Sequence, residues 1–339
     1  MLTAAVVGLG WWGQTILRML APSPALRIGR LVSASAAGAA LGRAHGIPTT
    51  PDYADALADP AIEAVILATP NSLHPAQVIA AAAAGKHVFC EKPLALATAD
   101  AEAAVAACGR AGVVLGIGHE RRFEPALMEL ARLLRAGALG APLLIEANFS
   151  QDRFLDLKPG NWRLSTAEAP AGPLTATGVH LLDLAVSLLG PAESVLARVH
   201  DRGAAFANGD AFSALVGFPG GAQALIGALL ITPFASRFAL YGNEGWAEVV
   251  DLAHPDRPAG ARLALHRRGA APVQRDFPAV SAVRANLEAF AAAARGEAPY
   301  PIPTAEMIAT VALTEAAIRS AATDAVVSLA PSNPGGTAP

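Results

Sequence analysis

The sequence is poor in cysteine, in aromatic side chains and in charge. Its 339 residues include 2 cysteines, too few for a disulfide framework or a cysteine-based metal site, and we predict no metal. Charged residues make up 16% with a net charge of -3, and no Lys/Arg cluster provides the basic stripe typical of nucleic-acid binders. With 53% hydrophobic residues the chain can bury a large core, and its length favours two domains.

Long unbroken hydrophobic runs are lacking as well. Two stretches without charge, 64–85 and 211–236, are long enough to span a bilayer. The first contains Pro70 and Pro75, and the second contains Pro219 with two glycines, so neither favours a lipid-exposed helix. The apolar start also lacks the basic segment of a signal peptide. We therefore predict a soluble cytoplasmic protein that contacts neither membrane nor nucleic acid.

Two patterns divide the chain near residue 120. Before it, apolar strands alternate with helices, which predicts a doubly wound parallel α/β sheet. After it, apolar strands between 194 and 265 are separated by tight turns, which predicts an α+β domain with a large open, mostly antiparallel sheet. We expect a nucleotide-binding domain over 1–120, a substrate-binding and oligomerisation domain over 121–329, and a disordered tail over 330–339.

The turn after the first predicted strand carries Gly-Leu-Gly-Trp-Trp-Gly, which matches G-x-G-x-x-G. Gly8 can form the tight turn, Gly10 lets the backbone approach a pyrophosphate, and Gly13 lets the helix pack on the strand. The helix N-terminus, at Trp11 and Trp12, supplies free N–H groups for the phosphates. A purely structural turn is the alternative, but the flanking strand and helix favour a Rossmann dinucleotide site.

The predicted second strand ends without the acidic residue that binds the ribose in NAD-selective sites. The segment Ser33–Gly38 carries no acid, and the first one after it is Asp52. Ser35, Arg30 or Arg43 could contact a 2′-phosphate, although Arg43 also fits an ordinary exposed helical position. We therefore expect NAD(P) as cofactor, with a preference for NADP.

Three further segments carry polar residues where ligands bind in open α/β sheets, or at the start of a helix. They are Thr69, Pro70, Asn71 and His74 after one strand, Glu91, Lys92 and Pro93 after the next, and Gly178, His180 and Asp183 in the second half. We expect the cofactor to be bound by Thr69, Pro70, Asn71, His74, Glu91 and Lys92.

Together with the glycine turn, Gly118-His119 and Arg121-Arg122-Phe123, these segments resemble the Gfo/Idh/MocA family in residues and in order. The resemblance implies a nicotinamide-dependent oxidoreductase. Such an enzyme passes hydride between the nicotinamide and a carbinol carbon of a sugar, cyclitol or related cyclic polyol or acid. It also implies a homo-oligomer, and the apolar strands at 211–218 and 222–231 favour a dimer or tetramer formed through the C-terminal sheet.

By this resemblance Lys92 holds the reacting oxygen and helps to relay its proton, and His180 is the catalytic histidine. Pro93 fixes the turn that carries Lys92, through a cis bond as is usual in the family, and His74 shapes the nicotinamide pocket. A surface lysine and a structural buried histidine are the alternatives, which the motifs disfavour. Many members have Asp four residues before the histidine, where this chain has Ala176.

The loop from 152 to 165 is the predicted specificity element. Its basic side chains could pair with a substrate carboxylate or phosphate, and its tryptophan could stack on a ring. The candidate substrate contacts, some of them outside the loop, are Arg122, Arg153, Asn161, Trp162, Arg163 and Thr177. A solvated loop or a subunit contact is the alternative for this loop.

Two other functions are compatible with the same residues. One is an NAD(P)-dependent glycoside-cleaving relative, which uses its cofactor without net turnover. The other is a non-catalytic dinucleotide sensor, which the loss of Asp at position 176 leaves open and which Lys92 and His180 argue against.

Overall fold

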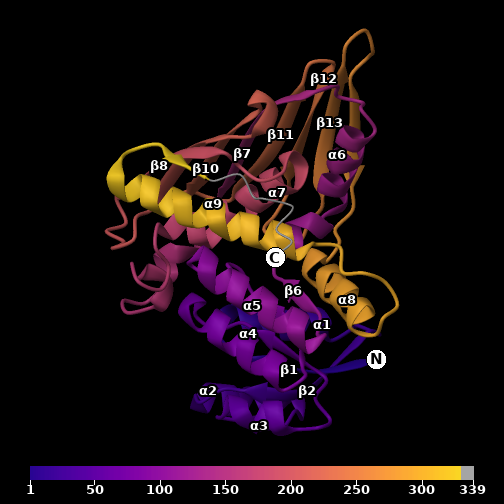
Figure 1. Ribbon diagram of the computed structural model, residues 1–339, viewed down its shortest axis with the longest axis vertical. Helices are drawn as coiled ribbons and strands as arrows, with labels where there is room; N and C mark the ends of the chain where they lie inside the picture. Colours follow the sequence, from indigo (N-terminus) through magenta and orange to yellow (C-terminus); the bar gives the residue numbers. More distant parts are fainter. Residues whose placement is uncertain (330–339) are drawn as a thin grey trace, which may run out of the picture. The chain divides into compact units, whose positions relative to one another are not determined.

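The computed structural model describes residues 1–329, so the predicted disordered tail lies outside the described residues. The chain forms two compact units (Figure 1). The first contains Met1–Phe123 and Ser281–Met307, and the second contains Glu124–Val280 and the described residues 308–329. The predicted division near residue 120 is close to the first junction. The expectation of one continuous domain over 121–329 differs from these units, because 281–307 packs with the N-terminal unit.

The first unit is built on six parallel strands in the order β3-β2-β1-β4-β5-β6. Their bounds are β1 (Leu2–Val7), β2 (Leu26–Val32), β3 (Thr49–Thr50), β4 (Ala64–Leu67), β5 (His87–Cys90) and β6 (Leu115–Ile117). The strand order reverses between β1 and β4, which is the point where doubly wound sheets bind their ligands. The predicted parallel fold is therefore confirmed.

Helices α1 to α5 connect these strands. They are α1 (Trp11–Leu20), α2 (Ala36–His45), α3 (Tyr53–Ala58), α4 (His74–Ala83) and α5 (Thr98–Ala111). The sequence analysis missed the short elements β3 and α3, which have too few residues to show a hydrophobic period. The hydroxyl of Thr98 suggests that this residue caps α5. The cap is instead Ala97, which has an extended backbone, and Thr98 is the first residue of the helix.

Helix α8 (Ala282–Ala294) explains why a late segment belongs to the first unit. The Phe290 ring packs edge-on against Phe89 of β5, with 5.6 Å between the ring centroids. A side chain at Gly116 of β6 would meet both rings, with its Cβ 2.8 Å from Phe290. The buried Asn286 amide also donates to the carbonyl oxygen of Ile117 at 2.9 Å. These contacts join residues about 170 to 200 positions apart, so the helical pattern alone could not reveal them.

The second unit is built on a nine-stranded sheet in the order β14-β13-β12-β11-β7-β10-β9-β8-β15. All neighbours are antiparallel except β7 and β10, as the sequence analysis predicts for this half. The strands are β7 (Pro142–Ser150), β8 (Ser194–His200), β9 (Ala211–Gly217), β10 (Gln223–Leu229), β11 (Ala235–Gly242), β12 (Gly245–Asp251), β13 (Ala261–Arg267), β14 (Val273–Phe277) and β15 (Val327–Ser328).

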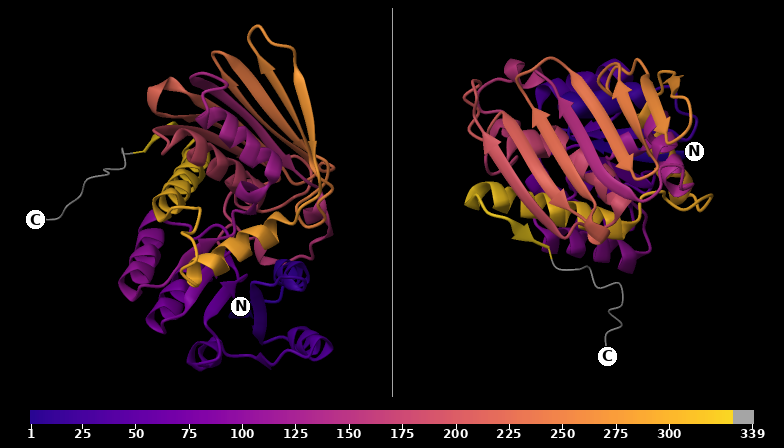
Figure 2. Two further views of the ribbon diagram at one scale, coloured as in Figure 1. Left: turned by 90° about the vertical axis from the view of Figure 1, so that its right-hand side faces the viewer. Right: turned by 90° about the horizontal axis from the view of Figure 1, so that it is seen from above.

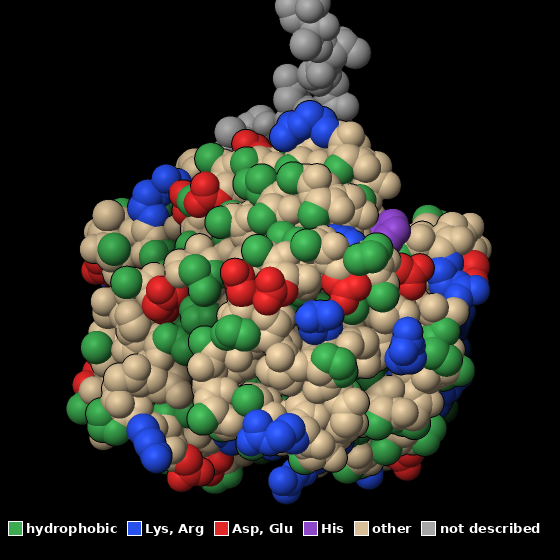
Figure 3. Space-filling view, turned by 90° about the horizontal axis from the view of Figure 1, so that it is seen from below, with side chains coloured by type: hydrophobic (Ala, Val, Ile, Leu, Met, Phe, Trp, Pro, Cys, Tyr) green, Lys and Arg blue, Asp and Glu red, His purple; other side chains and the backbone are tan. Residues whose placement is uncertain are grey.

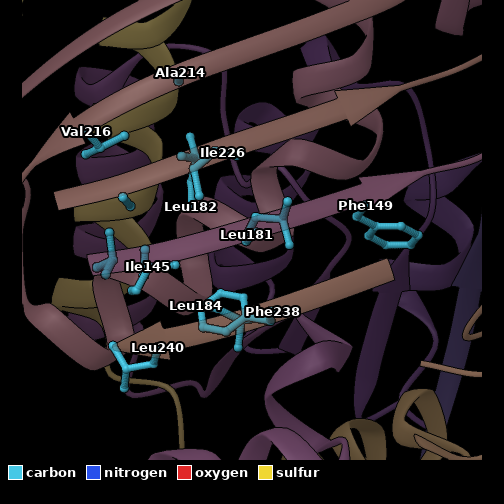
Figure 4. Packing of buried hydrophobic residues seen from close by; sticks show 14 of the residues in the cluster. Ile145, Phe149, Leu181, Leu182, Leu184, Ala214, Val216, Ile226, Phe238 and Leu240 are labelled. Atoms are coloured by element: carbon cyan, nitrogen blue, oxygen red, sulfur yellow. The ribbon is translucent and has the colours of Figure 1, made fainter. Parts of the chain in front are cut away.

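One face of this sheet carries the core of the second unit. Figure 4 shows Leu181, Leu182 and Leu184 of α7 (Val179–Leu189) among inward side chains of β7, β9, β10 and β11. Helix α6 (Pro125–Arg135) and the later part of α9 (Thr304–Thr323) complete this layer. Within residues 1–329 no helix covers the opposite face (Figure 2, right). Strand alternation therefore places one set of side chains in the core and the other on an open surface.

The two uncharged stretches are divided among separate elements. The first contains β4 and α4, and the second contains β9, a turn at Pro219–Gly221, and β10. Among the described residues no helix has the length and hydrophobicity needed to cross a bilayer. On the face in Figure 3 the basic and acidic side chains of the described residues are interspersed.

Candidate active site

The glycine turn between β1 and α1 has the geometry of a phosphate cradle. Gly8 has φ +89°, and a Cβ there would lie 2.6 Å from the carbonyl oxygen of Ala68. A Cβ at Gly13 would lie 2.0 Å from the Gly8 carbonyl oxygen, whereas a Cβ at Gly10 would meet no heavy atom within 4 Å. Two glycines thus allow close packing and the third leaves open space. Helix α1 begins at Trp11 without a side-chain cap, so its first N–H groups suit an anion.

The two tryptophans lie at the start of α1. Their ring centroids are 5.3 Å apart. Trp11 is 46% exposed, which makes it available to a bound molecule. The indole nitrogen of Trp12 is buried and has no hydrogen-bond partner among the described residues. Both predicted cofactor residues therefore lie beside the cradle.

The end of β2, where the ribose is expected, carries serines. Ser35 is exposed, and its Oγ accepts from the Gly38 N–H at 3.0 Å as the N-cap of α2. The Arg30 guanidinium forms an ion pair with Asp59 at 2.6 Å, so a protein carboxylate already holds this candidate. Arg43 is exposed on α2. Of the three candidates for a 2′-phosphate, Arg30 thus has its charge balanced by Asp59.

His74 joins the two loops that follow β4 and β5. Its Nδ1 lies 2.7 Å from the carbonyl oxygen of Pro93, and its Nε2 lies 3.1 Å from that of Thr69. The ring is fully buried, and in its neutral form it can donate to one of these carbonyls only. Thr69 is also held through its hydroxyl, which donates to Gln77 at 2.6 Å. These contacts fit the predicted role of His74 in shaping a pocket wall.

The segment after β5 carries Glu91, Lys92 and Pro93. The Lys92–Pro93 peptide bond is cis, as the family resemblance implies. Glu91 is buried, and a side chain at Gly118 would meet its carboxylate at 2.4 Å, so the carboxylate requires a glycine there. Burial, together with the nearby Glu91, raises the pKa of the Cys90 thiol well above its usual range. Cys90 therefore remains a protonated thiol at neutral pH.

In the second unit, His180 lies on the first turn of α7 and is 4% exposed. Its ring packs against Phe149 of β7, with the centroids 6.0 Å apart. A π-helical turn, Leu174–Gly178, leads directly into α7 and contains Ala176. The sequence analysis begins the helix at Gly178 and misses this turn, which shows the same apolar pattern as an α-helix. π-Helical turns occur frequently at functional sites.

The hydroxyl groups in this π-helical turn bond to the backbone. Thr175 donates to the Gly172 carbonyl oxygen at 3.2 Å, and Thr177 donates to that of Pro173 at 3.3 Å. Both threonines are buried. A hydroxyl that donates its proton to a carbonyl oxygen keeps lone pairs on its own oxygen, which can accept a hydrogen bond.

The predicted specificity loop is anchored by a cluster that the sequence analysis missed. The Arg153 guanidinium donates twice to the Asp256 carboxylate, at 2.6 and 2.9 Å. His254 Nδ1 lies 2.8 Å from the same carboxylate, and its ring contacts Phe149 at 5.7 Å between centroids. Although burial alone would raise the pKa of Asp256, the bonds from His254 and Arg153 hold it well below its usual range. Arg153 therefore carries a structural ion pair.

The remaining substrate candidates are distributed over both units. Asn161 caps a short 3-10 helix by accepting from the Arg163 N–H at 3.0 Å, and the Arg163 guanidinium lies 4.3 Å from the Trp162 ring centroid. Asn208 donates to the Arg163 carbonyl at 2.8 Å and so holds this part of the loop. In the first unit, Arg122 pairs with Glu306. No group of three or more potential metal ligands occurs within residues 1–329.

Two family matches cover most of the chain. Residues 2–119 match the oxidoreductase family with an NAD-binding Rossmann fold, and residues 127–248 match the GFO/IDH/MocA C-terminal domain. The chain belongs to this oxidoreductase family.

The chain is similar to several named enzymes, and the matched part of each enzyme differs in length. A D-xylose 1-dehydrogenase (NADP(+)) of Haloferax volcanii is 30% identical over 84% of this chain and 86% of that protein. A 1,5-anhydro-D-fructose reductase of Ensifer adhaerens is 35% identical over 61% of this chain and 63% of that reductase. Three curated relatives are matched over 46 to 63% of their own length.

A solved structure covers almost the whole fold. The aldose-aldose oxidoreductase from Caulobacter crescentus, complexed with glycerol, has 28% identity and a TM-score of 0.86 over 97% of this chain and 99% of that one. The likeness thus extends through both units, including the sheet that carries the predicted specificity loop.

Proposed function

We propose that this protein is an NAD(P)-dependent oxidoreductase. It moves hydride between the nicotinamide and a carbinol carbon of a sugar, cyclitol or related cyclic polyol or acid. The observation that carries the proposal is the glycine cradle at the β1/β4 switch point, where the open space at Gly10 admits a pyrophosphate and Lys92 follows β5 at the same sheet edge. The named relatives, among them a D-xylose dehydrogenase and an anhydrofructose reductase, support this substrate class.

Lys92 and His180 carry the proton chemistry in this proposal. The bound nicotinamide supplies the hydride acceptor or donor. Lys92 holds the reacting hydroxyl oxygen and shares its proton, while His180 acts as acid or base on the substrate. Ala176 cannot accept a hydrogen bond through its side chain, so the proton relay has no carboxylate at this position. Glu91, buried beside Lys92, and His74, between the two loops, keep the lysine segment in place.

The end of β2 favours NADP. An acidic residue there would bind the ribose hydroxyls of NAD and repel a 2′-phosphate. Ser33 and Ser35 carry no charge, and the exposed Ser35 hydroxyl can donate to a phosphate oxygen.

A second copy of the chain covers the open face of the nine-stranded sheet. This face carries Leu215 and Leu225, which are 39% and 45% exposed. On the neighbouring strands of the same face, Arg237 pairs with Glu146 at 2.8 Å and with Glu248 at 3.1 Å. A shallow hollow of about 480 Å³ lies over β8, β9, β10, β7 and β11. Exposed apolar surface of this kind marks association sites.

Both cysteines are free and buried, which fits a reducing cytoplasm.

A substrate panel of sugars, cyclitols and their acids tests the proposed activity. NAD and NADP are supplied in parallel, and the absorbance of reduced nicotinamide is followed. Turnover of at least one cyclic polyol is expected. Sugar release without net change in the cofactor would instead indicate glycoside cleavage. Cofactor binding without either reaction would indicate a sensor.

A further inference from the structure

Gln151 is a buried polar residue to which neither the motifs nor the family resemblance assigns a role. It is 5% exposed, and its Oε1 has no hydrogen-bond partner among the described residues. Buried polar atoms in folded proteins are nearly always paired, and an unpaired one destabilises the fold. A buried amide oxygen of this kind is therefore a candidate for a ligand contact.

The position of Gln151 places it on the same side of the sheet as His180. It follows β7 directly, and its backbone N–H donates to the Leu229 carbonyl at 2.9 Å, which continues the pairing with β10. Ser150 bonds to Asn148 on the open face, at 2.9 Å. Because side chains alternate along a strand, Gln151 falls on the face of Phe149. The Phe149 ring in turn contacts His180, with 6.0 Å between centroids.

The backbone on both sides of Gln151 is held firmly. Before it, the Ser150 hydroxyl accepts from the Leu229 N–H at 3.0 Å. After it, the two bonds from Arg153 to the buried Asp256 fix the chain, and His254 completes that cluster. These contacts hold the backbone that carries the Gln151 side chain. The structure thus holds an unpaired polar group in place, as binding sites do.

We propose that Gln151 is a specificity-determining residue that binds one hydroxyl group of the polyol substrate. The inference rests on the proposed function. A hydroxyl can donate to the amide oxygen, and it can accept from the amide nitrogen if the two ends of the amide are exchanged. The cluster of Arg153, Asp256 and His254 has a positioning role, because it acts through the backbone of Gln151.

The test is Gln151→Met, which keeps the length of the side chain and removes its polar atoms. We expect kcat/KM for the best polyol to fall about 100-fold, because a site built to bind a hydroxyl loses much of its discrimination without the bond. The Kd for NADP should not change. The Tm of the substrate-free protein should stay level or rise, since the unpaired oxygen is gone. Gln274→Met, at an exposed position of β14, is the matched control and should change none of these quantities.

Monodeoxy analogues of the polyol provide a second readout. One analogue should be a poor substrate for the wild type, and Gln151→Met should lose most of the preference for the parent polyol over that analogue. Four outcomes overturn the inference: unchanged kcat/KM, a lower Tm with equal loss for every substrate, an unaltered preference over all analogues, or a weakened affinity for NADP. Absence of polyol turnover in the wild type would overturn the proposed function itself, and so is distinguishable from these results.

Discussion

The cradle in the first unit and the wall around His180 in the second unit are built in different ways. The cradle consists of backbone from six consecutive residues, 8 to 13, and its shape depends on glycines that lack a Cβ. The wall consists of side chains from β7, α7, the 152–165 loop and the 252–260 loop, and Arg153 meets Asp256 across 103 positions. A site formed by backbone can therefore be recognised from a short sequence motif, whereas a site formed by side chains depends on the tertiary fold.

Replacement of Lys92 should have the largest effect. Lys92→Ala is expected to lower kcat about 1,000-fold, because positioned proton transfer contributes 10²–10⁴-fold to rate. The cradle in the same unit is unaltered, so calorimetry should give the wild-type Kd for NADP. A variant that keeps full activity would remove the lysine from the mechanism, and one that loses NADP binding would make it a cofactor residue only.

The two units also differ in how their sheets are covered. Within the described residues, only the sheet of the second unit has a face that no helix covers. Leu225→Lys would place a charge on this face. We expect the dissociation constant of the oligomer to rise up to about 100-fold. Leu225 is 45% exposed, so association can bury about half of a side chain whose full burial contributes roughly 1.5–3 kcal/mol, and two copies are changed. Light scattering across a concentration series measures it. A wild-type protein that is monomeric at micromolar concentration would contradict the oligomer.

The glycines of the cradle allow packing and ligand binding to be separated. In Gly10→Ala the new Cβ meets open space, so the free energy of unfolding should equal that of the wild type. The Kd for NADP should rise about tenfold, because the new Cβ lies where the pyrophosphate approaches. Gly13→Ala places a Cβ 2.0 Å from the Gly8 carbonyl oxygen and should destabilise the fold by roughly 1–3 kcal/mol. Urea unfolding and calorimetry measure the two quantities. Equal behaviour of the two variants would contradict the distinction.

The smallest expected effect concerns cofactor choice. Ser33→Asp supplies the missing acid at the end of β2, and we expect the ratio of affinities to move about fivefold towards NAD, which corresponds to roughly 1 kcal/mol. Parallel titrations with NAD and NADP give this ratio. A wild type that already binds NAD much more tightly would contradict the assignment made from the serines.

The local elements of the first unit could be predicted from the sequence. Helix α1 begins at Trp11 and β5 ends at Cys90, as the hydrophobic patterns indicate, because these limits depend on glycine, proline and apolar spacing nearby. The π-helical turn at Leu174–Gly178 could not be predicted, because a change from i→i+4 to i→i+5 hydrogen bonds leaves no mark in the hydrophobic pattern of so short a stretch.

The roles of side chains in the proposed substrate site could not be predicted from the sequence either. Arg153 looks like a substrate contact when only its loop is considered, because an arginine fork binds any carboxylate of suitable geometry. Only the fold shows that Asp256 is its partner. Gln151 carries no motif and was not among the predicted residues. Its importance rests on the unpaired oxygen, which is a property of packing.

By itself the sequence determined the parallel nucleotide-binding fold, the glycine cradle and the order of the family motifs, because each depends on neighbours within a few residues. The tertiary structure alone decided that α8 completes the first unit, that Asp256 and His254 hold Arg153, and that the Gln151 amide oxygen is buried without a partner within residues 1–329. These features depend on contacts between residues far apart in the chain. Such contacts are selected by how the whole core packs, and not by local preference.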